Sequence, residues 1–118
     1  MLHITMPRGD LRSFKLAVKE SASGAITEKT FDDIYFTVKV IYLAEPYKIQ
    51  KRLSAGTIVK DEEGYYHFTI QPEDTNDLQF GDYDFDIELV KEGAIKQTTI
   101  GKLTLSPEVT YESNEVGA

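Results

Sequence analysis

Apolar and polar residues alternate with a period of two in several stretches of this chain. The alternation is clearest in residues 14–19, 34–42 and 83–89. A period of two is the repeat of a β-strand, in which successive side chains point to opposite faces, whereas a helix repeats every 3.6 residues. One face of each stretch is apolar and the other is mostly polar. This pattern predicts antiparallel strands that pack one face on a core and leave the other in water.

Weaker strand patterns and turn residues fill most of the remaining chain. The weaker strands are expected at residues 2–5, 47–53, 65–71 and 95–105. The segment 71–78 has a proline near its start followed by acidic residues, which predicts one helical turn. Residues 26–32 are a candidate for a second short turn. About seven short strands separated by turn residues favour an all-β sandwich or barrel.

A local motif makes the fold prediction more specific. Gly81-Asp82-Tyr83-Asp84-Phe85 is similar to the tyrosine corner of immunoglobulin-type domains, in which a tyrosine hydroxyl bonds to the backbone of the preceding turn. Phe85 would then occupy the position of the usual cysteine, and Phe14 or Leu16 would face it. The alternative is that Tyr83 is an ordinary strand aromatic. We predict an immunoglobulin-like antiparallel β-sandwich with one or two short helical turns.

Length and composition set the domain organisation and exclude several functions. The 118 residues correspond to one domain, expected at residues 1–110, followed by a flexible C-terminal tail at 111–118. Cysteine is absent, and the net charge is −7. The acidic balance argues against direct nucleic-acid binding, and no apolar run approaches the length of a membrane span. Neither a nucleophile elbow nor a phosphate-binding loop occurs, so we predict no enzyme, no cofactor and no metal.

The charges are distributed unevenly along the chain. Residues 1–60 hold 10 basic and 6 acidic residues, whereas residues 61–92 hold 1 basic and 11 acidic residues. Four acidic residues share one face of the strand at 83–89 and its start: Asp82, Asp84, Asp86 and Glu88. Same-face residues on a strand lie about 6.5 Å apart, which is too far to converge on one calcium ion. We expect a solvated face partly matched by outward residues of the neighbouring strands, namely Tyr35, Thr37, Lys39, Lys96, Thr98 and Lys102.

A second use of these charges is contact with other protein chains. The candidate partner-binding residues are the acidic set together with Lys48, Lys51 and Arg52. An acidic and a basic half on one small domain would allow head-to-tail pairing with copies or partners, and Lys60 would join the other three basic residues on the basic side. The strands at 2–5 and 95–105 are the expected sheet edges, and edges invite pairing with other chains.

Three further patterns carry weaker functional hypotheses. Arg8-Gly9-Asp10 matches an adhesion tripeptide, and the alternative interpretation is a tight turn. His3 and His67 have no neighbouring histidine at ligand spacing, so a metal or general-base role lacks support. Tyr65 beside His67 would form a stacking platform for sugar or protein, although such surface residues usually only pack.

Segments from both halves of the chain together resemble the N-terminal domain of phage baseplate upper proteins and related immunoglobulin-like tail proteins of Firmicute phages and prophages. The segments are Arg8-Gly9-Asp10 with Phe14-Lys15-Leu16, Ile34–Lys39, Pro72–Thr75 with Gly81–Leu89, and 101–110. The resemblance implies a virion component, made in the bacterial cytoplasm. It would bind other phage structural proteins within a tail or baseplate, as one of several copies. Relatives of this kind usually continue into a helical and fibre-like region.

Two other function classes stay open at this point. A small acidic domain can mimic nucleic-acid charge and block a host defence nuclease, with the residues 82–88 as its working surface. A carbohydrate-binding adhesion module based on Tyr65 is the other hypothesis, and it would require export.

Overall fold

The computed structural model describes residues 2–20, 22–40 and 46–107, which form two β-sheets and one short helix. The strands are β1 (Leu2–Pro7), β2 (Arg12–Leu16), β3 (Asp33–Lys39), β4 (Ile49–Arg52), β5 (Val59–Lys60), β6 (Tyr66–Ile70), β7 (Gly81–Lys91) and β8 (Ala94–Ser106), and the helix is α1 (Pro72–Thr75). The predicted C-terminal tail at 111–118 and the end of the strand predicted at 34–42 lie outside the described residues.

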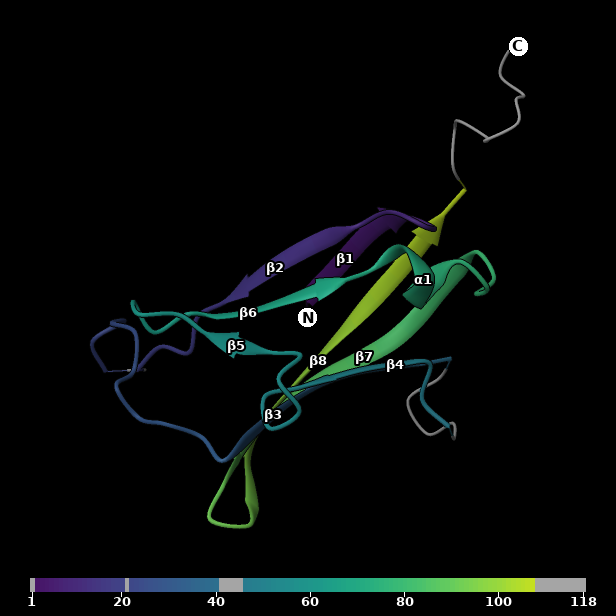
Figure 1. Cartoon of the computed structure of the whole chain (residues 1–118). Coiled ribbons are helices and arrows are strands. Elements are labelled where there is room, and N and C mark those ends of the chain that lie inside the picture. The colour runs from purple at the N-terminus through teal and green to yellow at the C-terminus, as the bar shows by residue number, and fades with distance from the viewer. Residues whose placement is uncertain (1, 21, 41–45, 108–118) are drawn as a thin grey trace.

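The two sheets lie face to face as the layers of a sandwich (Figure 1). One sheet has the order β1-β8-β7-β3-β4, and the other has the order β2-β6-β5. From β2 onward, these orders match the G-F-C-C′ and B-E-D arrangement of an immunoglobulin-like sandwich. The predicted fold class is therefore confirmed.

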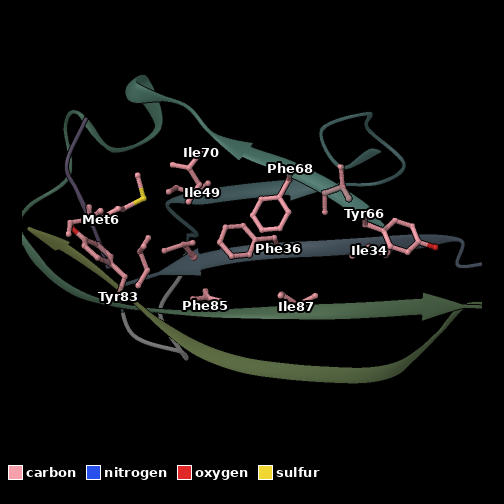
Figure 2. Packing of buried hydrophobic residues seen from close by; sticks show 14 of the residues in the cluster. Met6, Ile34, Phe36, Ile49, Tyr66, Phe68, Ile70, Tyr83, Phe85 and Ile87 are labelled. Carbon is pink, nitrogen blue, oxygen red and sulfur yellow. The ribbon is translucent and has the colours of Figure 1, made fainter. Parts of the chain in front are cut away.

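The core lies between the sheets and consists of the inward residues of the alternating strands (Figure 2). Phe36 is its centre, with ring centroids 4.6 Å from Phe68 and 5.2 Å from Phe85. Phe14 stacks on Phe68 from β2, so the aromatic cluster joins both sheets at the position where many immunoglobulin domains have a disulfide.

The tyrosine corner is also confirmed. The buried Tyr83 side chain donates a hydrogen bond from its hydroxyl to the Gln79 carbonyl oxygen over 2.7 Å. Helix α1 fills this corner between β6 and β7. Its Gln71 cap and Asp74 form a reciprocal capping box, and Pro72 occupies its first turn.

Several details differ from the sequence prediction. The described residues form eight strands, one more than the seven predicted. The additional strand is β5, which has only two residues and is therefore too short to show a period of two in the sequence. The β1–β8 pair is parallel, so the sandwich is not antiparallel throughout. Residues 26–32 contain no helical turn and lead as irregular chain into β3.

The predicted sheet edges are partly confirmed. Strand β1 is an edge, but the second half of β8 lies between β1 and β7. β1 pairs only with residues 101–106 of β8, and residues 94–100 pair with β7 alone among the described strands.

Candidate interaction surface

The predicted acidic residues lie together on the outward face of the five-stranded sheet. Alternation along β7 buries Tyr83, Phe85, Ile87 and Leu89 and turns the residues between them outward. Asp82 is exposed, and Asp84, Asp86 and Glu88 are half-buried among neighbouring side chains. We call these four residues the acidic ladder.

Lysines from both flanking strands stand opposite the middle of the acidic ladder. Asp84 faces Lys102 of β8 on one side and Lys39 of β3 on the other. The Lys102 ammonium lies 2.7 Å from the Asp84 carboxylate, and this hydrogen bond raises the pKa of Lys102. The expectation that flanking lysines partly match the ladder is correct for this pair. Both side chains reach water, so the pair contributes little to stability.

The Asp82 end of the acidic ladder forms a hydrogen-bonded row with Thr104 of β8 and His3 of β1. Thr104 donates its hydroxyl to Asp82 over 2.7 Å, so His3 Nε2, 2.9 Å from the Thr104 oxygen, is the donor of the next bond. His3 is therefore joined to the same face as the acids.

At the other end, Glu88 lies in a hollow with aromatic walls. The hollow has a volume of about 380 Å³ and is lined by Tyr35, Thr37, Lys39, Tyr47, Gln50, Asp86 and Glu88. Partial burial raises the pKa of Glu88, and the negative charge of Asp86 adds to this effect while Lys39 opposes it. A cation entering the hollow would relieve this repulsion.

Lys96 was predicted to flank the acidic ladder, but it does not stand opposite any of its four residues. The β7–β8 register shifts between Leu89 and Val90, so Lys96 falls at an irregularity and instead borders a hollow with Lys91. Thr98 stands opposite Glu88 as expected. An inserted residue changes which face the following side chains occupy, and the sequence gives no mark of it.

The predicted basic residues do not form one patch. Lys51 stands opposite Phe36 on the inward side of β4, and its ammonium lies 2.8 Å from the Asp74 carboxylate of α1. Its side chain is only 12% exposed. Lys51 therefore holds the helix against the sheet, whereas Lys48 is exposed just before β4.

Arg52 lies on the outward face and is held by two groups. Its guanidinium stacks 4.5 Å from the ring centre of Tyr35 and donates a hydrogen bond over 2.8 Å to Asp33. Burial alone would raise the pKa of Asp33, but hydrogen bonds from Arg52, Ser54 and the Ile34 amide outweigh it and lower the pKa to about 2. Because Tyr35 stands opposite Glu88, Arg52 borders the acidic ladder instead of forming a separate basic half.

The Arg8-Gly9-Asp10 tripeptide forms a turn between β1 and β2. Gly9 has a φ of +85° and donates its amide to the buried Thr75 hydroxyl of α1. The Arg8 guanidinium lies 4.2 Å from the ring centre of Phe80 and bonds to the Leu78 carbonyl. These contacts attach the turn to the tyrosine corner.

Tyr65 and His67 are both engaged by neighbouring side chains. The Lys15 ammonium lies 4.0 Å above the Tyr65 ring and occupies one face of the predicted stacking platform. His67 lies 2.6 Å from Asp61, and this bond lowers the pKa of Asp61.

Over residues 2–20, 22–40 and 46–107, no group of three or more His, Cys, Asp or Glu side chains is arranged to hold a metal ion. No helix in those ranges has the length and apolarity to cross a membrane.

The sequence did not predict one feature of this surface and predicted another only in part. The aromatic walls of the Glu88 hollow come from Tyr35 on β3 and Tyr47 beside β4, and only the sheet register brings them together. The strand at 95–105 was expected to be a sheet edge, but only residues 94–100 have one side unpaired among the described strands, because β1 begins at Leu2, opposite Gly101. Neither a protein-family model nor a curated protein sequence matches this chain.

Proposed function

We propose that this protein is a non-enzymatic structural module of a phage or prophage tail or baseplate, and that it acts through contacts with other protein chains. The observation that carries the proposal is the outward face of the five-stranded sheet. It combines the acidic ladder, flanking lysines and an aromatic hollow on one face of the sheet.

The composition of this face suits a protein partner. Tyrosine and arginine are enriched where protein interfaces bury their central contacts, and Tyr35, Tyr47 and Arg52 gather at the Glu88 end. In the row formed by Lys39, Asp84 and Lys102, the charges alternate in sign across three strands, and this pattern favours one orientation of a partner over others. A lysine or arginine of the partner fits the Glu88 hollow, since a cation there would reduce the repulsion between Glu88 and Asp86.

The resemblance to baseplate and tail proteins supplies the setting. Its motifs lie at structural positions of the sandwich, since the Arg8-Gly9-Asp10 turn and α1 both support the tyrosine corner. In such assemblies, small modules of this kind would join receptor-binding or tail-fibre components to a hub.

The direct test is to induce prophage in the source strain, purify intact particles and quantify this chain by mass spectrometry. A fixed copy number per particle is the expected result. Absence from particles while the chain is abundant in the lysate would refute the structural role and favour a free inhibitor.

A charge-reversal variant tests the acidic ladder itself. Asp84→Lys with Asp86→Lys is expected to reduce incorporation into particles at least tenfold while the domain stays folded. The matched control is Glu62→Lys with Glu63→Lys, which makes the same charge change at two exposed acids between β5 and β6. Equal incorporation of both variants would show that the ladder is only a solvated face.

A further inference from the structure

We propose that the unpaired edge of β8 accepts the C-terminal segment 108–118 of a second copy of this chain as an added β-strand. The occupant is thus a second copy of the protein, joined head to tail. This inference rests on the proposed function only for its setting, because it concerns a different surface and a different test.

The receiving edge is long and almost uncharged. Apart from Lys96 at the register shift, residues 94–100 of β8 pair with β7 on one side, and no described strand pairs with their other side. In Figure 1 the β7–β8 hairpin extends beyond the rest of the sheet at this end. Ile95 and Ile100 are about half exposed there, and Lys96 is the one charge in the stretch. Free backbone groups of this kind pair readily with an extended segment.

An apolar groove runs beneath this edge, between β8 and β2. Two adjoining hollows of about 110 and 170 Å³ share Leu2, Leu16 and Ile87 in their walls. The larger one reaches the core rings Phe36 and Phe85. Because β2 is the outer strand of its own sheet, this side of the sandwich is open among the described residues. An added strand would pair with β8 and place alternate side chains in the groove.

The charges at the groove fit the C-terminal segment. The groove continues into a hollow of about 470 Å³ whose lining includes Lys19, Lys29, Lys91 and Lys96, with Glu20 as its one acid. The segment 108–118 carries three glutamates and no lysine or arginine. This opposite charge would steer the segment to the lysine end of the groove.

The residue pattern of the segment suits the same position. Val109 and Tyr111 share one face of an extended strand, and Glu115 follows on that face. A strand antiparallel to β8 would place Val109 and Tyr111 in the apolar part and Glu115 beside the lysines.

The segment of the same copy is poorly placed to fill this site. β8 ends at Ser106, and β1 covers its edge as far back as Gly101. A returning segment would need about 20 Å of chain to pass β1 before it reached the free edge. A second copy has no such constraint, and head-to-tail addition would build a ring or a filament.

Cysteine trapping tests the inference cleanly, because the chain has no cysteine of its own. A Thr99→Cys chain is mixed with a Tyr111→Cys chain under mild oxidation. Thr99 borders the groove, so we expect a disulfide-linked heterodimer at least tenfold above the control. The control replaces Thr99→Cys with Val59→Cys, at an exposed site on β5.

Sedimentation velocity of the unmodified chain provides a second measurement that does not depend on any variant. We expect association that rises with concentration, weakens with added salt, and is reversed by excess peptide of residues 107–118. A monomer at all concentrations with no trapped heterodimer would overturn the inference. A disulfide confined to single chains of the Thr99→Cys, Tyr111→Cys double variant would overturn it too. Either result leaves the virion experiment untouched.

Discussion

The Tyr83 hydroxyl provides the most direct test of the fold. It donates one hydrogen bond to the Gln79 carbonyl over 2.7 Å, and the ring below it is 6% exposed. Tyr83→Phe removes this bond and leaves the ring packing in place. A neutral hydrogen bond contributes about 0.5–1.5 kcal/mol to the free energy of unfolding, and an orphaned buried acceptor costs more.

The surroundings of Gln79 set the value within that range. Gln79 is exposed, so water replaces the hydroxyl at its carbonyl and the additional cost is small. We therefore expect a loss of about 1 kcal/mol. With an unfolding entropy of about 0.25 kcal/mol/K for 118 residues, this loss lowers the melting temperature by about 4 °C.

The assay is urea unfolding followed by circular dichroism, with Tyr47→Phe as the matched control at an exposed tyrosine. The control is expected to change the free energy of unfolding by less than about 0.3 kcal/mol. Hydrogen exchange should also be faster at the Asn76 and Leu78 amides, which bond within the corner. Equal stability and equal exchange in Tyr83→Phe and the parent chain would refute the tyrosine-corner interpretation.

Three other substitutions test the core, the Asp33 network and the acidic ladder. Gly101→Ala should cost about 2–3 kcal/mol in thermal unfolding, because a Cβ there would overlap Phe85 and lie 2.8 Å from the Leu2 carbonyl oxygen; an unchanged melting temperature would contradict this packing. Asp33→Asn should remove about 1–2 kcal/mol from the free energy of unfolding at pH 7. The lowered pKa of Asp33 stabilises the fold above pH 3.8, and this stability is lost as the pH falls toward 2. The free energy of unfolding measured in urea should therefore change less with pH in the variant than in the parent chain over that window, and an equal change in both would contradict it. Glu88→Gln should raise the melting temperature slightly at pH 7 and less at pH 4. The raised pKa of Glu88 means that its charged form destabilises the folded state, and this form is less populated at pH 4. A lower melting temperature of the variant at pH 7 would contradict this prediction.

The sequence predicted the parts of the fold that follow from alternation. The period-two pattern of residues 83–89 placed the acidic ladder outward, and the register then set Lys39 and Lys102 beside Asp84. The tyrosine corner was found because its motif is local and contiguous. These predictions needed no knowledge of which elements meet.

The features that the sequence did not predict depend on tertiary contacts. Lys51 looks like a surface charge in the sequence, yet its partner Asp74 lies on α1 and becomes adjacent only when the sheets close. The register shift at Leu89 and Val90 moves Lys96 away from the acidic ladder without any glycine or proline to mark it. Strand β5 is defined only by the pairing of its two residues with His67 and Tyr66 of β6, which is a tertiary contact.

Residues 94–100 of β8 form a sheet edge that no described strand covers. Proteins that stay monomeric usually protect such edges with charges, prolines or bulges. The irregularity near Lys96 protects only the residues beside the turn. Gln97, Thr98, Thr99 and Ile100 follow with neither charge nor proline. Apolar walls lie directly beneath them, including Leu16 and Ile87. The unpaired backbone of β8 and the apolar hollows beside it are the two features that the proposed added strand would cover.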